Sequence, residues 1–181
     1  MGVMVRDRRG AYHYLTVGFL ALLFAGCSSG PKYRPVEVPS TADAAYNRGD
    51  YETAHSLYKR EAEQGKAEAQ YTLGVMYYTG RGVPQDYAEA AKWYRKAAEQ
   101  GYAAAQYNLG FMYYTGRGVQ RDSIPAHMWF NLAASRYPVS EIKNRNDAIV
   151  YRDRVASLMT PAQIAEAQRL ATEWKPKTEA R

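Results

Sequence analysis

A segment of this chain occurs twice, at a fixed offset of 36 residues. Two stretches are identical at 13 of 15 positions: residues 69–83 read AQYTLGVMYYTGRGV and residues 105–119 read AQYNLGFMYYTGRGV. Periods of about 20 to 50 residues are typical of solenoids, in which each unit buries its apolar face only against its neighbours. The sequence therefore predicts a repeat protein, an architecture that points to binding and not obviously to catalysis.

The repeat extends beyond these stretches in both directions. Downstream, Asp86 and Trp93 recur as Asp122 and Trp129. Upstream, a degenerate third copy occupies residues 41–65, where several residues precede their counterparts by the same 36 positions. About three units are therefore expected.

The apolar spacing of the middle unit predicts a helix over residues 67–79. Ala69, Leu73 and Tyr77 fall four residues apart and share one helix face. Gly74, beside that face, lets a neighbouring helix approach closely, and Gly110 is its counterpart in the next unit.

Glycines end this helix. Gly80 and Gly82 follow it directly, and glycine accepts the left-handed conformation that a helix C-terminus often requires. Gly116 and Gly118 have the same place in the next unit.

A second helix is predicted from Asp86 to about Gln100. Asp86 is a natural N-cap, and Glu89 three residues later completes a capping-box pattern. Trp93 is the large residue of an otherwise alanine-rich inner face. In the next unit Asp122 and Trp129 take these roles, although a proline replaces the glutamate.

The recurring glycines, turn valine and tryptophan resemble the Sel-one-like repeat (SLR) family, which is related to tetratricopeptide repeats. Residues 67–101 and 103–134 match that consensus, whereas residues 41–65 match only its second half. The resemblance implies an all-α fold, an α/α solenoid of about three helix pairs over residues 41–137. It also implies an assembly scaffold rather than an enzyme.

Residues 138–174 are expected to cap the solenoid, since a terminal repeat leaves a face that must be covered. Tyr151, Val155 and Leu158 show helical spacing, and Thr160 begins a further helix as an N-cap, with proline at the first position and a glutamine that closes the box. Residues 175–181 are predicted to be a flexible tail.

The first 26 residues have the composition of a signal peptide, with a basic start and an apolar run of about 15 residues. Leu23 to Cys27 resembles the lipobox of bacterial lipoproteins, although Phe24 replaces the usual leucine. The resemblance implies that Cys27, the only cysteine, carries the lipid after cleavage of residues 1–26. The alternative is an ordinary secretory signal with a chance cysteine.

Residues 27–40 are rich in proline and are expected to form an extended tether. Ser28 follows the cysteine in place of the aspartate that often retains lipoproteins at an inner membrane. The predicted location is therefore the cell envelope, with the outer membrane favoured and the repeats facing the periplasm.

The charge excludes a nucleic-acid partner. Loss of residues 1–26 removes three arginines and Asp7, which lowers the net charge from +6 to +4. This mild excess is not a nucleic-acid signature.

Catalytic and metal-binding patterns are missing from the sequence. His55 and His127 lie two periods apart, without further ligands at short helical spacing, so both are interpreted as surface or packing residues. No nucleophile or phosphate-loop motif occurs. The protein is predicted to be no enzyme and to need no cofactor or metal.

An excess of aromatic residues supplies the candidate binding site. In tetratricopeptide-like stacking the first helix of each pair lines a concave groove, and six residues resemble the groove-facing set: Tyr71, Val75, Tyr78, Tyr107, Phe111 and Tyr114. Tyrosine offers a large contact area with a polar end, which suits binding. The alternative is that these side chains only pack between repeats.

The predicted function is a protein-interaction adaptor or assembly scaffold for an envelope protein or peptide. A second reading is glycan binding, or organisation of an exopolysaccharide or cell-wall machine, because stacked tyrosines also suit sugars. Were the groove not the binding surface, Arg81 and Arg117 in the Gly-Arg-Gly loops would be the next candidates.

Overall fold

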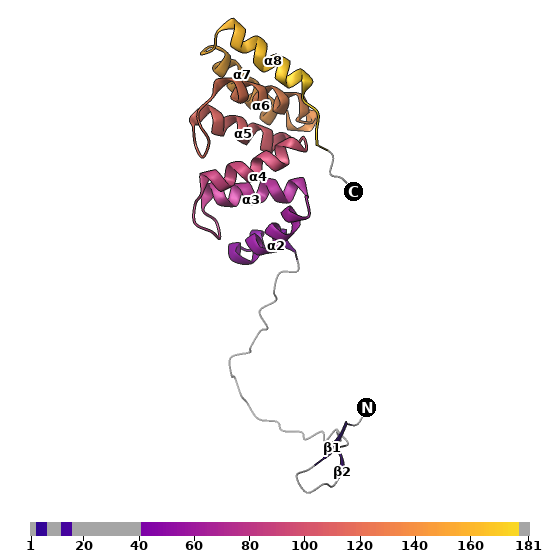
Figure 1. Ribbon diagram of the computed structural model, residues 1–181. Helices are drawn as coiled ribbons and strands as arrows, with labels where there is room; N and C mark the ends of the chain where they lie inside the picture. The colour runs from indigo at the N-terminus through magenta and orange to yellow at the C-terminus, as the bar shows by residue number, and fades with distance from the viewer. Residues whose placement is uncertain (1–2, 7–11, 16–40, 178–181) are drawn as a thin grey trace, which may run out of the picture. The chain divides into compact units, whose positions relative to one another are not determined.

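The computed structural model describes residues 3–6, 12–15 and 41–177 (Figure 1). Near the N-terminus, β1 (Val3–Arg6) and β2 (Tyr12–Leu15) form an antiparallel hairpin in which Val3 lies opposite Leu15. Cys27 and the predicted tether lie outside the described residues. No helix of the described chain is long and apolar enough to cross a membrane.

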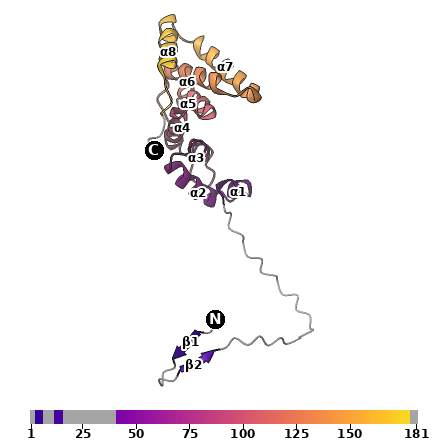
Figure 2. The same ribbon diagram turned by 90° about the vertical axis from the view of Figure 1, so that its right-hand side faces the viewer.

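The described residues from 41 onward are helical and stack in pairs (Figures 1 and 2). In chain order the helices are α1 (Ala42–Asn47), α2 (Tyr51–Glu63), α3 (Ala67–Thr79), α4 (Tyr87–Glu99), α5 (Ala103–Thr115), α6 (Ser123–Arg136), the 3-10 turn η1 (Val139–Glu141), α7 (Ile142–Ala156) and α8 (Pro161–Glu173). The pairs α1–α2, α3–α4 and α5–α6 pack on one another in sequence, and α7 and α8 both pack on α6. This confirms the predicted all-α solenoid with C-terminal capping helices.

The glycine stops are as predicted. Gly80 and Gly116 end α3 and α5 in the left-handed conformation, with φ of 73° and 76°. Gly82 and Gly118 also have positive φ and lie against the preceding repeat. A Cβ on Gly118 would stand 2.1 Å from the carbonyl oxygen of Tyr87, so the loop backbone touches the backbone at the start of α4.

The N-caps are confirmed, but one capping box is incomplete. Asp86 Oδ1 accepts the backbone N–H of Glu89 at 3.0 Å. The return bond is not formed, because the N–H of Asp86 already donates to the carbonyl of Tyr77 at 2.9 Å. The Glu89 carboxylate pairs with Lys92 Nζ at 2.8 Å instead. At the N-terminus of α8, Thr160 and Gln163 form both hydrogen bonds of a capping box.

Two details at the C-terminus differ from the sequence expectation. Leu158 does not belong to the buried face of α7, because that helix ends at Ala156 and Leu158 is 60% exposed. Lys177, within the predicted tail, is held by its backbone N–H to the Glu99 carbonyl at 2.8 Å and by an ion pair with the same residue. Residues 178–181 lie outside the described range.

Small residues on the second helices bring the pairs close together around one large ring. Ala90, Ala97 and Ala98 of α4 are fully buried, and Trp93 is 7% exposed among them. Its counterpart Trp129 is 6% exposed and meets the ring of Trp174 edge-on, with centroids 6.2 Å apart. The tryptophan at this position therefore fills the space between consecutive units.

Trp129→Ala should lower the free energy of unfolding by about 3 to 5 kcal/mol, because it removes a buried aromatic side chain and leaves a cavity between α6 and α8. Urea denaturation of the full chain, followed by circular dichroism, measures this loss. Trp129→Phe is the matched control and should cost less. A Trp129→Ala protein with an unchanged midpoint would show that the tryptophan does not hold the cap.

Gly118→Ala should destabilise more than Gly116→Ala, although both glycines have positive φ. At Gly116 the added Cβ meets only Arg121 at 3.3 Å, so the cost is the backbone strain of about 1 kcal/mol. At Gly118 the Cβ runs into backbone atoms of α4, which adds about 1 to 3 kcal/mol. Equal urea midpoints for the two variants would contradict the close contact between loop and helix.

Candidate functional site

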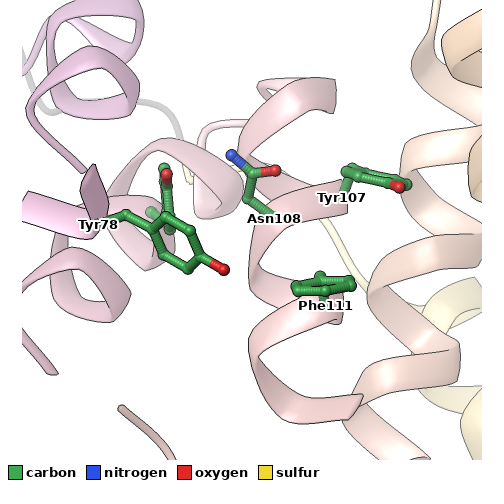
Figure 3. A pocket seen from close by; sticks show the side chains of 5 residues that line it. Tyr78, Tyr107, Asn108 and Phe111 are labelled. Carbon is green, nitrogen blue, oxygen red and sulfur yellow. The ribbon is translucent and has the colours of Figure 1, made fainter. Parts of the chain in front are cut away.

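A cavity of about 240 Å³ opens between the second and third repeats. Its lining consists of Tyr78 of α3, Tyr94 of α4, and Tyr107, Asn108 and Phe111 of α5. Tyr78 faces the α5 side chains across the cavity (Figure 3). All five lining side chains are uncharged, so the cavity suits an apolar or aromatic group that makes few hydrogen bonds.

Tyr94 is held in the cavity wall by the glycine opposite it. A Cβ on Gly74 would lie 2.6 Å from the Tyr94 ring, so only glycine admits the ring at this depth. Tyr94 is 2% exposed, and burial raises the pKa of its phenol well above the usual range. The phenol is therefore neutral at any physiological pH.

Tyr78 is fixed at the rim by the loop of the next repeat. Arg117 Nη1 donates to the Tyr78 hydroxyl at 2.6 Å, and the Tyr78 ring meets Tyr87 edge-on with centroids 5.1 Å apart. Arg81 repeats this arrangement one unit earlier by donating to the hydroxyl of Tyr46 at 2.7 Å. The loop arginines therefore connect each repeat to the one before it.

Tyr107 and Phe111 separate the cavity from the capping helix. Each packs against Tyr151 of α7, with ring centroids 5.8 and 5.7 Å apart. Burial, together with the nearby Tyr151 and Asp147, raises the pKa of Tyr107 to about 12. Tyr151 therefore holds these two lining residues of the cavity from behind.

The other predicted groove residues do not line this cavity. Tyr71 packs on Tyr94 and Tyr102, with centroids 5.9 and 5.1 Å apart, and Val75 packs against the same core cluster. Tyr114 lies against Tyr151 at 6.2 Å. The predicted set thus divides into three residues that face the cavity and three that pack between helices.

The sequence prediction missed Tyr94 and Asn108. Burial raises the pKa of the Tyr71 and Tyr94 phenols, and the nearby Asn108 side chain partly offsets this rise. A comparison of the two repeat copies could have identified Asn108. Over the 15 nearly identical residues the copies differ only where Thr72 becomes Asn108 and Val75 becomes Phe111, and both third-repeat residues line the cavity.

The two histidines are packing residues. His55 Nε2 lies 3.2 Å from the Tyr77 hydroxyl, and burial lowers its pKa. His127 is 3% exposed and borders a polar cavity of about 570 Å³ among α6, α7 and α8. Burial and the nearby Arg152 lower its pKa, which favours a neutral imidazole. Within the described part of the chain no three histidine, cysteine or carboxylate side chains group as a metal site would require.

Comparison with known proteins agrees with this geometry. The Sel1 repeat family model matches residues 67–102 and 103–137. No curated protein sequence matches the chain significantly.

Solved structures with a similar fold include c5321, a protective antigen present in uropathogenic Escherichia coli strains that displays an SLR fold. It is 32% identical to this chain, with a TM-score of 0.64. The match covers 75% of this chain but only 30% of c5321. The Sel1 repeat protein from Oxalobacter formigenes is 28% identical to this chain, with a TM-score of 0.52. The match covers 73% of this chain and 60% of the Oxalobacter protein.

Proteins built from Sel1 repeats are typically protein-interaction scaffolds and generally not enzymes. Here the matched segments coincide with the helix pairs α3–α4 and α5–α6, which carry the cavity between them. Residues 67–137 therefore consist of two consecutive Sel1 repeats, and the chain folds as an SLR solenoid.

Proposed function

We propose that this protein is a non-enzymatic adaptor that binds a partner polypeptide in the cavity between its two Sel1 repeats. The observation that carries this proposal is where the repeats diverge. Thirteen of 15 positions are the same in both copies and the two that differ are the cavity residues Asn108 and Phe111. Packing accounts for the positions that are the same in both units. Asn108 and Phe111 give the cavity two side chains that the preceding repeat lacks at these positions.

The lining is suited to a polypeptide ligand. Tyr78 and Tyr107 offer large contact areas and lose little rotamer entropy on binding, because both are already packed against neighbouring rings. Asn108 supplies both an amide donor and an acceptor for a peptide group. A preformed, mostly aromatic cavity with few polar groups is typical of a binding site that anchors a single side chain.

We further propose that the adaptor is anchored in a bacterial envelope by lipid on Cys27, with the outer membrane favoured. Support comes from the lipobox-like Leu23 to Cys27 at the end of an apolar run, and from the absence of any other cysteine in the sequence. Two or more acyl chains give stable anchoring, which a single chain does not. The repeats would then meet partners in the periplasm.

The double variant Asn108→Thr/Phe111→Val should lose its partner and remain folded. Thr72 and Val75 stand at the same two positions of the preceding repeat. Both residues are therefore compatible with this helix, as α3 shows. The measurement is affinity capture from envelope extract with the full chain, followed by mass spectrometry. A thermal melt checks that the variant keeps its helical structure.

Lys92→Gln is the matched control, because Lys92 is exposed on α4 and does not line the cavity. It should retain every partner. If the double variant is folded and captures the same proteins as the wild type, the cavity is not the adaptor surface. If soluble cell-wall fragments bind there and no protein does, the ligand is a glycan.

Cys27→Ser should abolish lipid attachment and leave an uncleaved or soluble form. Radiolabelled palmitate is fed to cells that express the full chain, and the label on the purified protein is counted. Cys27 is the only thiol, so no other cysteine can accept the label. Undiminished labelling of the Cys27→Ser protein would refute the anchor.

A further inference from the structure

Eight residues of the two Sel1 repeats form two equivalent sets, seven of them aromatic. The first set is Tyr71, Val75, Tyr78 and Tyr94; the second set, 36 residues later, is Tyr107, Phe111, Tyr114 and Phe130. In both sets a ring from the second helix packs over a glycine of the first. A Cβ on Gly110 would lie 3.1 Å from the Phe130 ring, as one on Gly74 would meet Tyr94.

The second set is covered by one tyrosine of the capping helix. The ring of Tyr151 stacks on Phe130, with centroids 5.4 Å apart and planes 23° from parallel. It meets the other rings of the set edge-on, at 5.8 Å from Tyr107, 5.7 Å from Phe111 and 6.2 Å from Tyr114. One phenol ring is therefore in contact with every aromatic member of the second set.

The first set borders the cavity instead. Tyr78 and Tyr94 border the cavity of about 240 Å³, whose other lining residues belong to α5. Tyr102 packs on Tyr71, and Tyr71 packs on Tyr94, which is only 2% exposed. The space for a further ring therefore lies beside Tyr78 and the α5 residues. A cavity of about 150 Å³ in another protein accommodates benzene, so the volume suffices for a phenol ring.

We infer that the cavity takes a tyrosine or phenylalanine side chain of the partner, which packs against the aromatic lining as Tyr151 of α7 packs edge-on against Tyr107 and Phe111. The inference rests on the proposed adaptor function and names the side chain that the partner inserts. The chain itself thus contains an example of the contact. Edge-on and offset stacked rings at centroid distances of about 4.5 to 7 Å are the favoured aromatic geometry, and the second set shows that these positions provide it.

The probe for this inference is p-cresol, the analogue of a tyrosine side chain, titrated into the isotope-labelled full chain and followed by NMR. We expect saturable shifts at the Asn108 side-chain amide and the Phe111 backbone amide, with a dissociation constant on the order of 1 mM for so small a ligand. N-acetylglucosamine, titrated in the same way, should leave these signals unchanged.

Tyr151→Ala is a second test within the same chain, because it removes the ring that covers Phe130 and leaves a space there for p-cresol. The variant should bind p-cresol at two places, near Asn108 and near Phe130, whereas the wild type binds it only near Asn108. The first readout uses the wild-type chain, so the test stands even where Tyr151→Ala loses its fold.

The inference is overturned if the wild type shows no saturable shift at Asn108, whatever Tyr151→Ala does, or if N-acetylglucosamine binds there and p-cresol does not. This outcome is distinct from failure of the adaptor function. If p-cresol does not bind but capture of a protein still depends on Asn108 and Phe111, the adaptor stands and its anchor is not aromatic.

Discussion

An aromatic ring packed over a glycine joins the two helices of each Sel1 repeat, and the rest of the structure depends on this contact. Tyr94 lies over Gly74, and Phe130 lies over Gly110. Because the glycine has no side chain, each ring fits closely against the other helix of the pair and is almost completely buried. Tyr94 also borders the cavity. The same residue thus stabilises the repeat and forms part of the candidate binding surface.

Only three of the six predicted groove residues border the cavity. A side chain such as Tyr71 packs on the ring that covers the glycine, and Tyr114 lies against the capping helix. Both proposed uses of the aromatic residues, packing between repeats and contact with a ligand, are therefore present in one set of positions. The cavity lies where α3, α4 and α5 meet, and its lining differs at Asn108 and Phe111 from the equivalent positions of the preceding repeat.

The helices could be predicted from the sequence because their signals are local. Period, N-caps and left-handed glycines located α3 and α4 to within a residue or two. Asn108 carries no local helix signal, and only its divergence from Thr72 in the preceding repeat distinguishes it. Tyr94 could not be assigned to a site from local signals either, because its environment arises only when α5 packs against α3 and α4. The incomplete box at Asp86 has the same cause, since the Tyr77 carbonyl that satisfies its N–H belongs to the preceding helix.

The central claim is that the cavity between the Sel1 repeats is where this protein contacts its partner. The most direct measurement is isotope-filtered NMR on the full chain in complex with the protein segment that it captures. The account predicts intermolecular contacts from a partner ring to the Asn108 side-chain amide and the Phe111 ring. Contacts confined to other surfaces, such as the exposed side of α4 around Lys92, with none to these two residues, would contradict it.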